Sequence, residues 1–144
     1  MKISDPNYHQ KLMEMCDCYL DTDYLKQLQK IATGASEDLE EDAIKYMALA
    51  ILEAITEQAG KLSFKKKGAK ASVAIKKEEN LSLPPPPLPL LEKIFAIMRI
   101  ILHLDEDKGA MELSLGLRNG QIDAQVKIER KKDKESLKLK FPRR

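Results

Sequence analysis

The chain has 144 residues, of which 43% are apolar and 33% are charged, and its formal net charge is +2. It is long enough to bury a hydrophobic core, and its composition excludes an intrinsically disordered chain. The longest apolar stretch is interrupted by charged residues, so no segment has the ~18 apolar residues that a membrane span requires.

The N-terminus and the cysteines indicate the compartment. The first ten residues lack the apolar core of a signal peptide. Cys16 and Cys18 are too close together to form a disulfide framework. We therefore expect a cytoplasmic protein.

The charge is distributed unevenly along the chain. Residues 1–60 contain 5 Lys or Arg and 12 Asp or Glu, whereas residues 61–144 contain 20 and 11. Such an asymmetry predicts a polar partner surface, head-to-tail self-association or nucleic-acid binding at the basic end. The alternative is that both halves present ordinary solvated faces.

The acidic half has the periodicity of helices. Asp5-Pro6 can start a first helix, residues 21–23 interrupt it, and the pattern continues to Gly34. We expect Ser36 to cap a further helix and Gly60 to end it in the left-handed conformation. The apolar positions of that helix form one continuous stripe, namely Ile44, Met47, Ala48, Ile51, Ile55 and Ala59.

The period changes from 3.6 to 2 after Gly60. Leu62/Phe64 and Ala71/Val73/Ile75 alternate with Lys and Ser, which predicts a hairpin with one buried face and a turn at Gly68. Leu81 and Leu83 are consistent with a short third strand.

Five prolines, Pro84–Pro87 and Pro89, lead into an apolar segment. Prolines cannot donate backbone hydrogen bonds, so we expect an extended, stiff spacer. The helix that follows carries only a narrow polar stripe at Glu92, Arg99 and His103, which predicts a buried central helix. The alternative interpretation of the prolines is a ligand for an aromatic-lined groove of a partner.

The last third predicts a three-stranded meander. Asn119-Gly120 suits a type I′ turn, which would place Leu115 opposite Ala124 and Glu112 opposite Lys127. The same register sets the remaining apolar pairs, Leu117 with Ile122, Leu113 with Val126 and Met111 with Ile128. Leu137, Leu139 and Phe141 alternate in the third strand.

Together these elements predict an α+β fold, in which N-terminal helices precede an antiparallel sheet packed on one long buried helix. We expect residues 1–35 to be a helical segment that forms one compact unit with an α+β domain at residues 36–144.

Residues 44–141 resemble the domain that precedes the motor in type II secretion and type IV pilus ATPases. "AILEAITEQA" (50–59) resembles that family's helix ending in ILEEA. "RIILHLDEDKG" (99–109) resembles its Leu-Asp element, and "GQIDAQV" (120–126) resembles its second strand. The resemblance implies a regulatory or docking domain whose partner is a secretion or pilus assembly component.

The chain also departs from that family. "GKLSF" (60–64) replaces the Ser-Asp-Ile-His strand start, Gln125 occupies the position of an arginine, and the Pro-Gln-Asp-Gly turn is absent. No G-x-x-x-x-G-K-[ST] loop is present to hold ATP phosphates.

No group of residues predicts catalysis, a cofactor or a metal. Cys16 and Cys18 point about 200° apart on a helix, so they cannot easily share one ion with His9. We expect Cys16 in the core and Cys18 on the surface. His103 near residues 105–107 is better explained as a histidine bonded to a carboxylate than as a proton-transfer group.

Two basic runs are the candidate contact residues. The first spans residues 61–77 without an acid and includes Lys65, Lys66, Lys67 and Lys70. The second follows residue 129 and includes Arg130, Lys131, Lys132 and Lys134. On one surface they could neutralise several phosphates. The alternative is that these are edge-strand lysines that prevent aggregation. The first run also argues against binding of single strands, because its only aromatic residue for base stacking is Phe64.

We expect a non-catalytic interaction, docking or regulatory module that binds another protein or a second copy of itself. The first alternative is nucleic-acid binding through Lys65–Lys67 and the Arg130–Lys134 turn. The second is a small-ligand sensor, which would need a cavity between the sheet and the buried helix.

Overall fold

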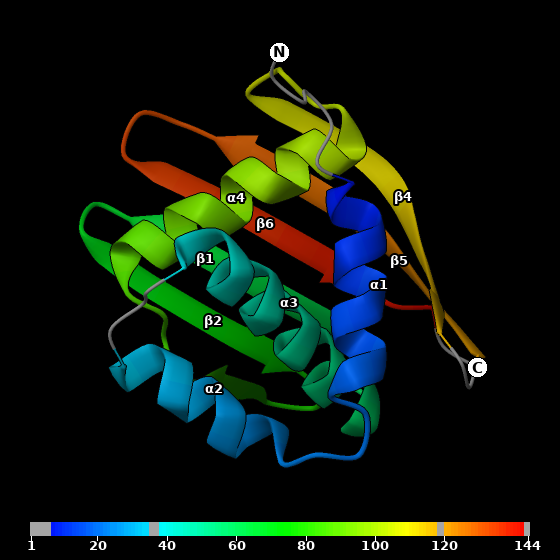
Figure 1. Ribbon diagram of the computed structural model, residues 1–144. Helices are drawn as coiled ribbons and strands as arrows, with labels where there is room; N and C mark the ends of the chain where they lie inside the picture. The colour runs from blue at the N-terminus through cyan, green and yellow to red at the C-terminus, as the bar shows by residue number, and fades with distance from the viewer. Residues whose placement is uncertain (1–6, 35–37, 118–119, 143–144) are drawn as a thin grey trace.

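The computed structural model describes residues 7–34, 38–117 and 120–142, which form an α+β fold as predicted. The elements follow one another as α1 (Tyr8–Cys18), α2 (Tyr24–Thr33), α3 (Leu39–Thr56), β1 (Lys61–Lys67), β2 (Lys70–Lys76), β3 (Asn80–Leu83), α4 (Leu88–Leu102), β4 (Lys108–Leu117), β5 (Gly120–Arg130) and β6 (Lys134–Lys140). Figure 1 shows the four helices gathered on one side of a single sheet.

The sheet has the strand order β3-β2-β1-β6-β5-β4, and each neighbouring pair is antiparallel. The predicted hairpin and the predicted meander are joined by β1 and β6, which pair from Lys61↔Lys140 to Lys67↔Lys134. Two turns also meet at one end of the sheet, where the Gly68 N–H donates to the Asp133 carbonyl at 2.8 Å. Gly68 has φ +58°, a conformation that glycine adopts at little cost.

Helix α3 is the most deeply buried element. Every residue from Ala43 to Ala54 except Lys45 is buried, because the sheet and α4 cover one side of α3 and α1 and α2 cover the other. The single apolar stripe that we predicted therefore underestimates the buried surface of this helix. Ile55, at the end of the predicted apolar stripe, is by contrast less buried than predicted, since it is 38% exposed.

The predicted ends of α3 need correction. Its N-cap is Asp38, whose side chain accepts from the Glu41 N–H at 3.1 Å, and the predicted cap Ser36 lies outside the described residues. The helix ends at Thr56, and Gln58 rather than Gly60 adopts a positive φ, of 58°. Gly60 comes directly before β1, and its N–H donates to the Lys76 carbonyl of β2 at 3.0 Å.

Pro84–Pro87 join β3 to α4 outside regular secondary structure, as the predicted spacer requires. Pro89, which was also predicted in the spacer, lies instead in the first turn of α4, where no backbone N–H is needed. The hydroxyl of Tyr46 on α3 donates to the Pro84 carbonyl and ties the spacer to the helical layer. In α4 most apolar positions, including Leu91, Ile94 and Met98, are buried, although Ile100 is exposed. Of the predicted polar stripe, Glu92 and His103 are exposed, whereas Arg99 is half-buried. Among the described helices, none is both long enough and apolar enough to cross a membrane.

The β4–β5 hairpin has a different register from the predicted one. Leu115 lies opposite Ile122, and Glu112 lies opposite Gln125 rather than Lys127, so the predicted pairs were wrong by two residues. A shift of two residues leaves every side chain on the same face, which is why the apolar pattern did not reveal it. Asn119 of the predicted turn lies outside the described residues.

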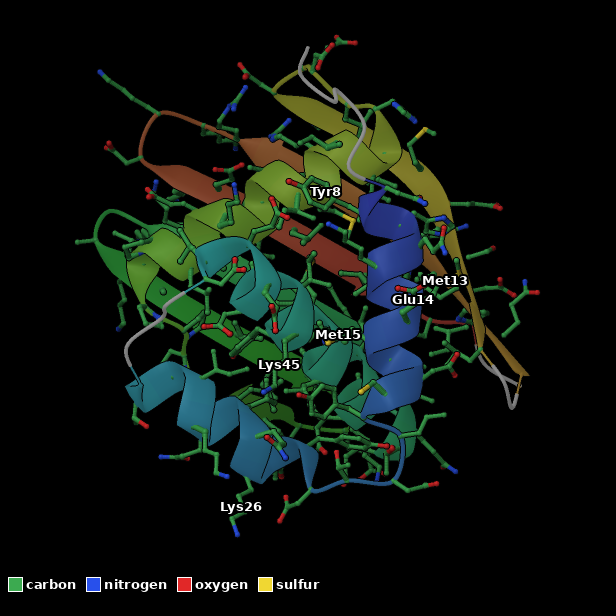
Figure 2. The ribbon with its side chains drawn as sticks, viewed as in Figure 1. Tyr8, Met13, Glu14, Met15, Lys26 and Lys45 are labelled. Carbon is green, nitrogen blue, oxygen red and sulfur yellow. The ribbon has the colours of Figure 1, made fainter. Side chains whose placement is uncertain are left out.

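Helix α1 covers part of the outer edge of β4. His9 Nε2 donates to the Ser114 carbonyl at 2.7 Å, and the Gly116 N–H donates to Met13 Sδ at 3.2 Å. Figure 2 shows Met13 on the side of α1 that faces β4. Cys16 on this helix is buried and Cys18 is exposed, as predicted.

Two ion pairs connect the polar stripe of α4 to the helix-facing side of the sheet. Lys66 Nζ lies 2.7 Å from Glu92 Oε2 at an exposed position, where the Glu92 side chain is 50% exposed. Arg99 Nε lies 3.3 Å from Glu135 Oε2, and these side chains are only 10% and 13% exposed. Arg99 Nη1 also donates to the Glu106 carbonyl at 2.6 Å. The second pair is therefore the one whose loss would leave a buried charge.

We expect Glu135→Gln to lower the free energy of unfolding by about 3 kcal/mol, because it leaves the buried guanidinium of Arg99 without its carboxylate. Urea denaturation at neutral pH measures this. The double variant Arg99→Leu/Glu135→Leu should recover most of the loss.

The matched control is Glu92→Gln, which removes the exposed pair between the same helix and the sheet and should cost at most about 0.5 kcal/mol. Equal losses of unfolding free energy in Glu92→Gln and Glu135→Gln would contradict the conclusion that the Arg99–Glu135 pair is buried and the Lys66–Glu92 pair is exposed.

Candidate functional site

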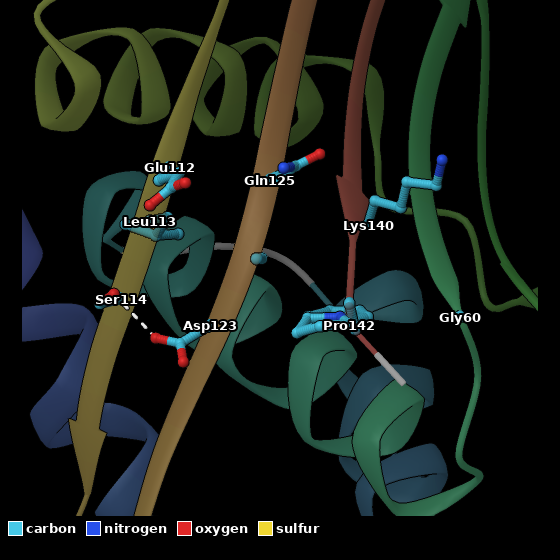
Figure 3. Close-up of a pocket in the computed structure, with 10 residues that line it drawn as sticks. Gly60, Glu112, Leu113, Ser114, Asp123, Gln125, Lys140 and Pro142 are labelled. Atoms are coloured by element: carbon cyan, nitrogen blue, oxygen red, sulfur yellow. Dashed lines mark hydrogen bonds between the residues drawn. The ribbon is translucent and has the colours of Figure 1, made fainter. Parts of the chain in front are cut away.

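No described element covers the side of the sheet that faces away from the helices. Leu62 and Phe64 of β1 are buried against the helices, so the intervening residues of β1 point to the opposite side. The same alternation holds in β2, where Val73 and Ile75 are buried, and in β6. Figure 3 views the sheet from this uncovered side, with the helices behind the strands.

Lysines dominate this side of the sheet. Of the twelve outward positions on β2, β1 and β6, eight are lysine and the others are Ser63, Ser72, Ala74 and Ser136. None of these twelve described positions carries a carboxylate. With the adjacent Lys127 of β5, they form what we call the lysine face: Lys61, Lys65, Lys67, Lys70, Lys76, Lys127, Lys134, Lys138 and Lys140.

Like charges lie directly opposite each other on the lysine face. Lys61 pairs with Lys76 on one side and with Lys140 on the other, and Lys67 lies between Lys70 and Lys134. Such cross-strand pairs destabilise a sheet. Partial burial lowers the pKa of Lys61, and repulsion from Lys138, Lys76, Lys65 and Lys140 lowers it further. The lysine face is thus a field of strong positive potential that the fold retains at a cost.

The structure separates the eight predicted contact residues. Lys65, Lys67, Lys70 and Lys134 belong to the lysine face, and Lys132 is exposed in the neighbouring turn.

The other three predicted residues are engaged with carboxylates. Lys66 points to the helical side and pairs with Glu92. Arg130 Nη2 lies 3.0 Å from Asp107 Oδ1, and Lys131 Nζ lies 3.9 Å from Glu129.

Five further residues complete the lysine face, and of these only Lys127 lay outside the two predicted basic runs. They are Lys61, Lys76, Lys127, Lys138 and Lys140. The alternation of apolar residues in each strand could have identified them, because every lysine next to a buried residue must point outward.

Acidic side chains mark the boundary of the lysine face toward β4. Asp123 on β5 accepts hydrogen bonds from Ser114 Oγ at 2.8 Å and from Gln121 Nε2 at 2.7 Å. Glu112 and Glu129 are the other carboxylates at outward positions of β4 and β5. The positive field therefore runs along β2, β1 and β6 and ends at β5.

A pocket of about 720 Å³ opens where β5 and β6 separate (Figure 3). The separation follows Lys140, after which the Phe141 N–H donates to the Gly60 carbonyl at 2.9 Å. Glu112, Asp123 and Lys140 line the rim. The pocket lies on the uncovered side of the sheet, rather than between the sheet and α4 where a ligand sensor was predicted to have its cavity.

The described residues contain no group of three or more His, Cys, Asp or Glu that could hold a metal ion. His103 ends α4 in the left-handed conformation, with φ 56°. The lysine face is thus the most distinctive chemical feature of the described chain.

No protein-family model matches this chain, and no curated protein matches it. The resemblance to the domain preceding the secretion ATPase motor therefore stays a prediction.

We expect Lys61→Gln to raise the free energy of unfolding by about 0.5 kcal/mol at low salt, because it removes repulsion from the lysines on both neighbouring strands. Added salt should stabilise the native protein more than this variant, since salt screens the same repulsion. Because the pKa of Lys61 is lowered in the folded state, the unfolded chain binds more protons there, and native stability should rise as the pH increases through that range.

The control is Lys30→Gln, which removes an exposed lysine in the last turn of α2, away from the lysine face, and should not stabilise the protein. Urea denaturation at two salt concentrations measures both variants. A loss of stability in Lys61→Gln would show that the lysine face is not under repulsive strain.

Proposed function

We propose that this protein is a non-catalytic binding module that holds a polyanion on its lysine face. The observation that supports this is the composition of the outward positions of β2, β1 and β6, where eight of twelve residues are lysine and none of these described positions is acidic. A protein surface that only keeps the chain soluble usually mixes positive and negative side chains, whereas the lysine face carries one sign of charge.

The position of these lysines argues against a purely protective role. Lysine on an edge strand prevents sheet-to-sheet aggregation. β1 and β6, however, are the two central strands of the sheet, and the edges are β3 and β4. Six of the nine residues of the lysine face lie on the central strands. Those lysines protect no edge, so a different reason is needed for their concentration.

The repulsion within the lysine face supports the same proposal. Partial burial lowers the pKa of Lys61 and repulsion from four other lysines lowers it further, so an anion bound there would relieve the repulsive part of this strain. Six acidic residues of the N-terminal half lie on α1 and α3, namely Glu14, Asp17, Glu40, Glu41, Asp42 and Glu53. The helices lie on the other side of the sheet from the lysine face (Figure 1). This separation of charge would orient the protein as it approaches a polyanion.

The test is retention on a heparin column at about 50 mM salt, where counterion release is strong. The native protein should be retained, and Lys65→Glu/Lys138→Glu should elute at much lower salt because two charges of the lysine face are reversed.

The control Lys26→Glu/Lys30→Glu has the same net charge but alters α2; Figure 2 shows Lys26 pointing away from the sheet. It should elute close to the native protein. Thermal unfolding confirms that each variant is folded. Passage of the native protein through the column, or equal losses in both double variants, would contradict the proposal.

A further inference from the structure

The kind of polyanion follows from which side chains the lysine face lacks, given the proposed function on which this inference rests. The chain has four Tyr and three Phe. Tyr8, Tyr24, Tyr46, Phe64, Phe95 and Phe141 are buried, and the half-buried Tyr19 on the helical side has Lys45 Nζ 4.9 Å from its ring centroid. Thus no aromatic side chain occupies an outward position of β2, β1 or β6 in the described chain.

This absence matters for nucleic acid because single strands are held largely by stacking of their bases on aromatic side chains, at about 1–3 kcal/mol per base. The bases of a duplex are already stacked on each other, and its outer surface presents phosphates. Lysine binds phosphate as a point charge and can contact only guanine among the bases, whereas the planar bidentate contacts that distinguish base pairs are typical of Arg, Asn and Gln. None of those three occupies the twelve outward positions described on β2, β1 and β6.

The lysine face also lacks the features of a protein interface. Stable protein interfaces have a core of aromatic and apolar anchors and are depleted in lysine. The exposed large apolar side chains of the described chain lie on helices or at helix-facing positions of edge strands, namely Leu25, Leu39, Ile55, Leu81, Ile100 and Met111. None of them would contact a partner that covers the lysine face.

The shape of the positive field favours a cylinder over a plane. Lys61 to Lys67 spans about 20 Å at ~3.3 Å per residue, and the strands from β2 to β5 span about 14 Å at ~4.8 Å per strand. The carboxylates of Glu112, Asp123 and Glu129 begin at β5. A flat anionic membrane would bring these carboxylates against negative headgroups. A duplex lying along β1 and β6 would contact only the lysine face.

We infer that the lysine face binds double-stranded nucleic acid through its phosphates alone, without reading the bases. A duplex carries one charge per ~1.7 Å, so about 12 phosphates fall within the length of the strip, and about half of them face the sheet. Nine lysines are enough to contact these.

Fluorescence anisotropy with the full chain tests the inference. The probes are labelled DNA and RNA duplexes of about 20 base pairs in two unrelated sequences, and an unstructured single strand with the same number of phosphates. Both duplex sequences should bind within about twofold of each other, and at least about fivefold more tightly than the single strand, which gains no stacking.

The salt dependence provides a second readout. The logarithm of affinity should fall with the logarithm of salt concentration with a slope of about −5, for about six phosphates at about 0.9 each, and Lys65→Gln should reduce its magnitude by about 0.9. The matched control Lys66→Gln changes the adjacent residue, which faces the helices, and should leave the slope unchanged.

Three results would overturn the inference. They are equal or tighter binding of the single strand, a strong preference for one duplex sequence, or binding to vesicles containing about 30% phosphatidylserine without binding to a duplex. None of these results contradicts the proposed function if the heparin column still retains the protein. If the native protein also passes through the heparin column, both this inference and the proposed function are overturned.

Discussion

The pairing of β1 with β6 is the interaction on which the rest of this structure depends. It joins the hairpin that follows α3 to the meander that follows α4, so that six strands form one sheet. Leu62 lies opposite Leu139 and Phe64 opposite Leu137, and all four side chains are buried. Burial stabilises by about 1.5–3 kcal/mol for each such side chain, which offsets the entropy of closing the long connection between the strands.

The same pairing creates the lysine face. Alternation along each strand sends leucine and phenylalanine toward the helices and lysine to the other side. Because β1 and β6 are adjacent, the lysines of two basic runs that are distant in the sequence become neighbours. Partial burial and, to a lesser extent, repulsion between these lysines lower the pKa of Lys61, and the repulsion opposes folding. The buried helical layer supplies the stability that tolerates this repulsion.

Local patterns were enough to predict much of the fold. Hairpin β1–β2, the buried helix α4 and the strands β4 to β6 follow from periods of 2 and 3.6. The burial of α3 on all sides depends on α1 and α2 packing over it, and no pattern within α3 could reveal this. The β4–β5 register was wrong by two residues because such a shift preserves both faces.

The site was only partly predictable for a related reason. Lys65 and Lys67 could be placed on one face by alternation, and the same rule excludes Lys66 from it. The pairs Lys66–Glu92 and Arg130–Asp107 join distant segments and so could not be predicted from neighbouring residues. That the two basic runs share a surface depends on strand order, which in an antiparallel sheet is set by non-local contacts.

Backbone NOEs in an isotope-labelled sample would test the β1–β6 pairing most directly. The account predicts cross-strand contacts of Leu62 with Leu139, Ser63 with Lys138 and Lys65 with Ser136. Contacts confined to β1–β2 and β5–β6, with none between β1 and β6, would contradict the single sheet and with it the lysine face.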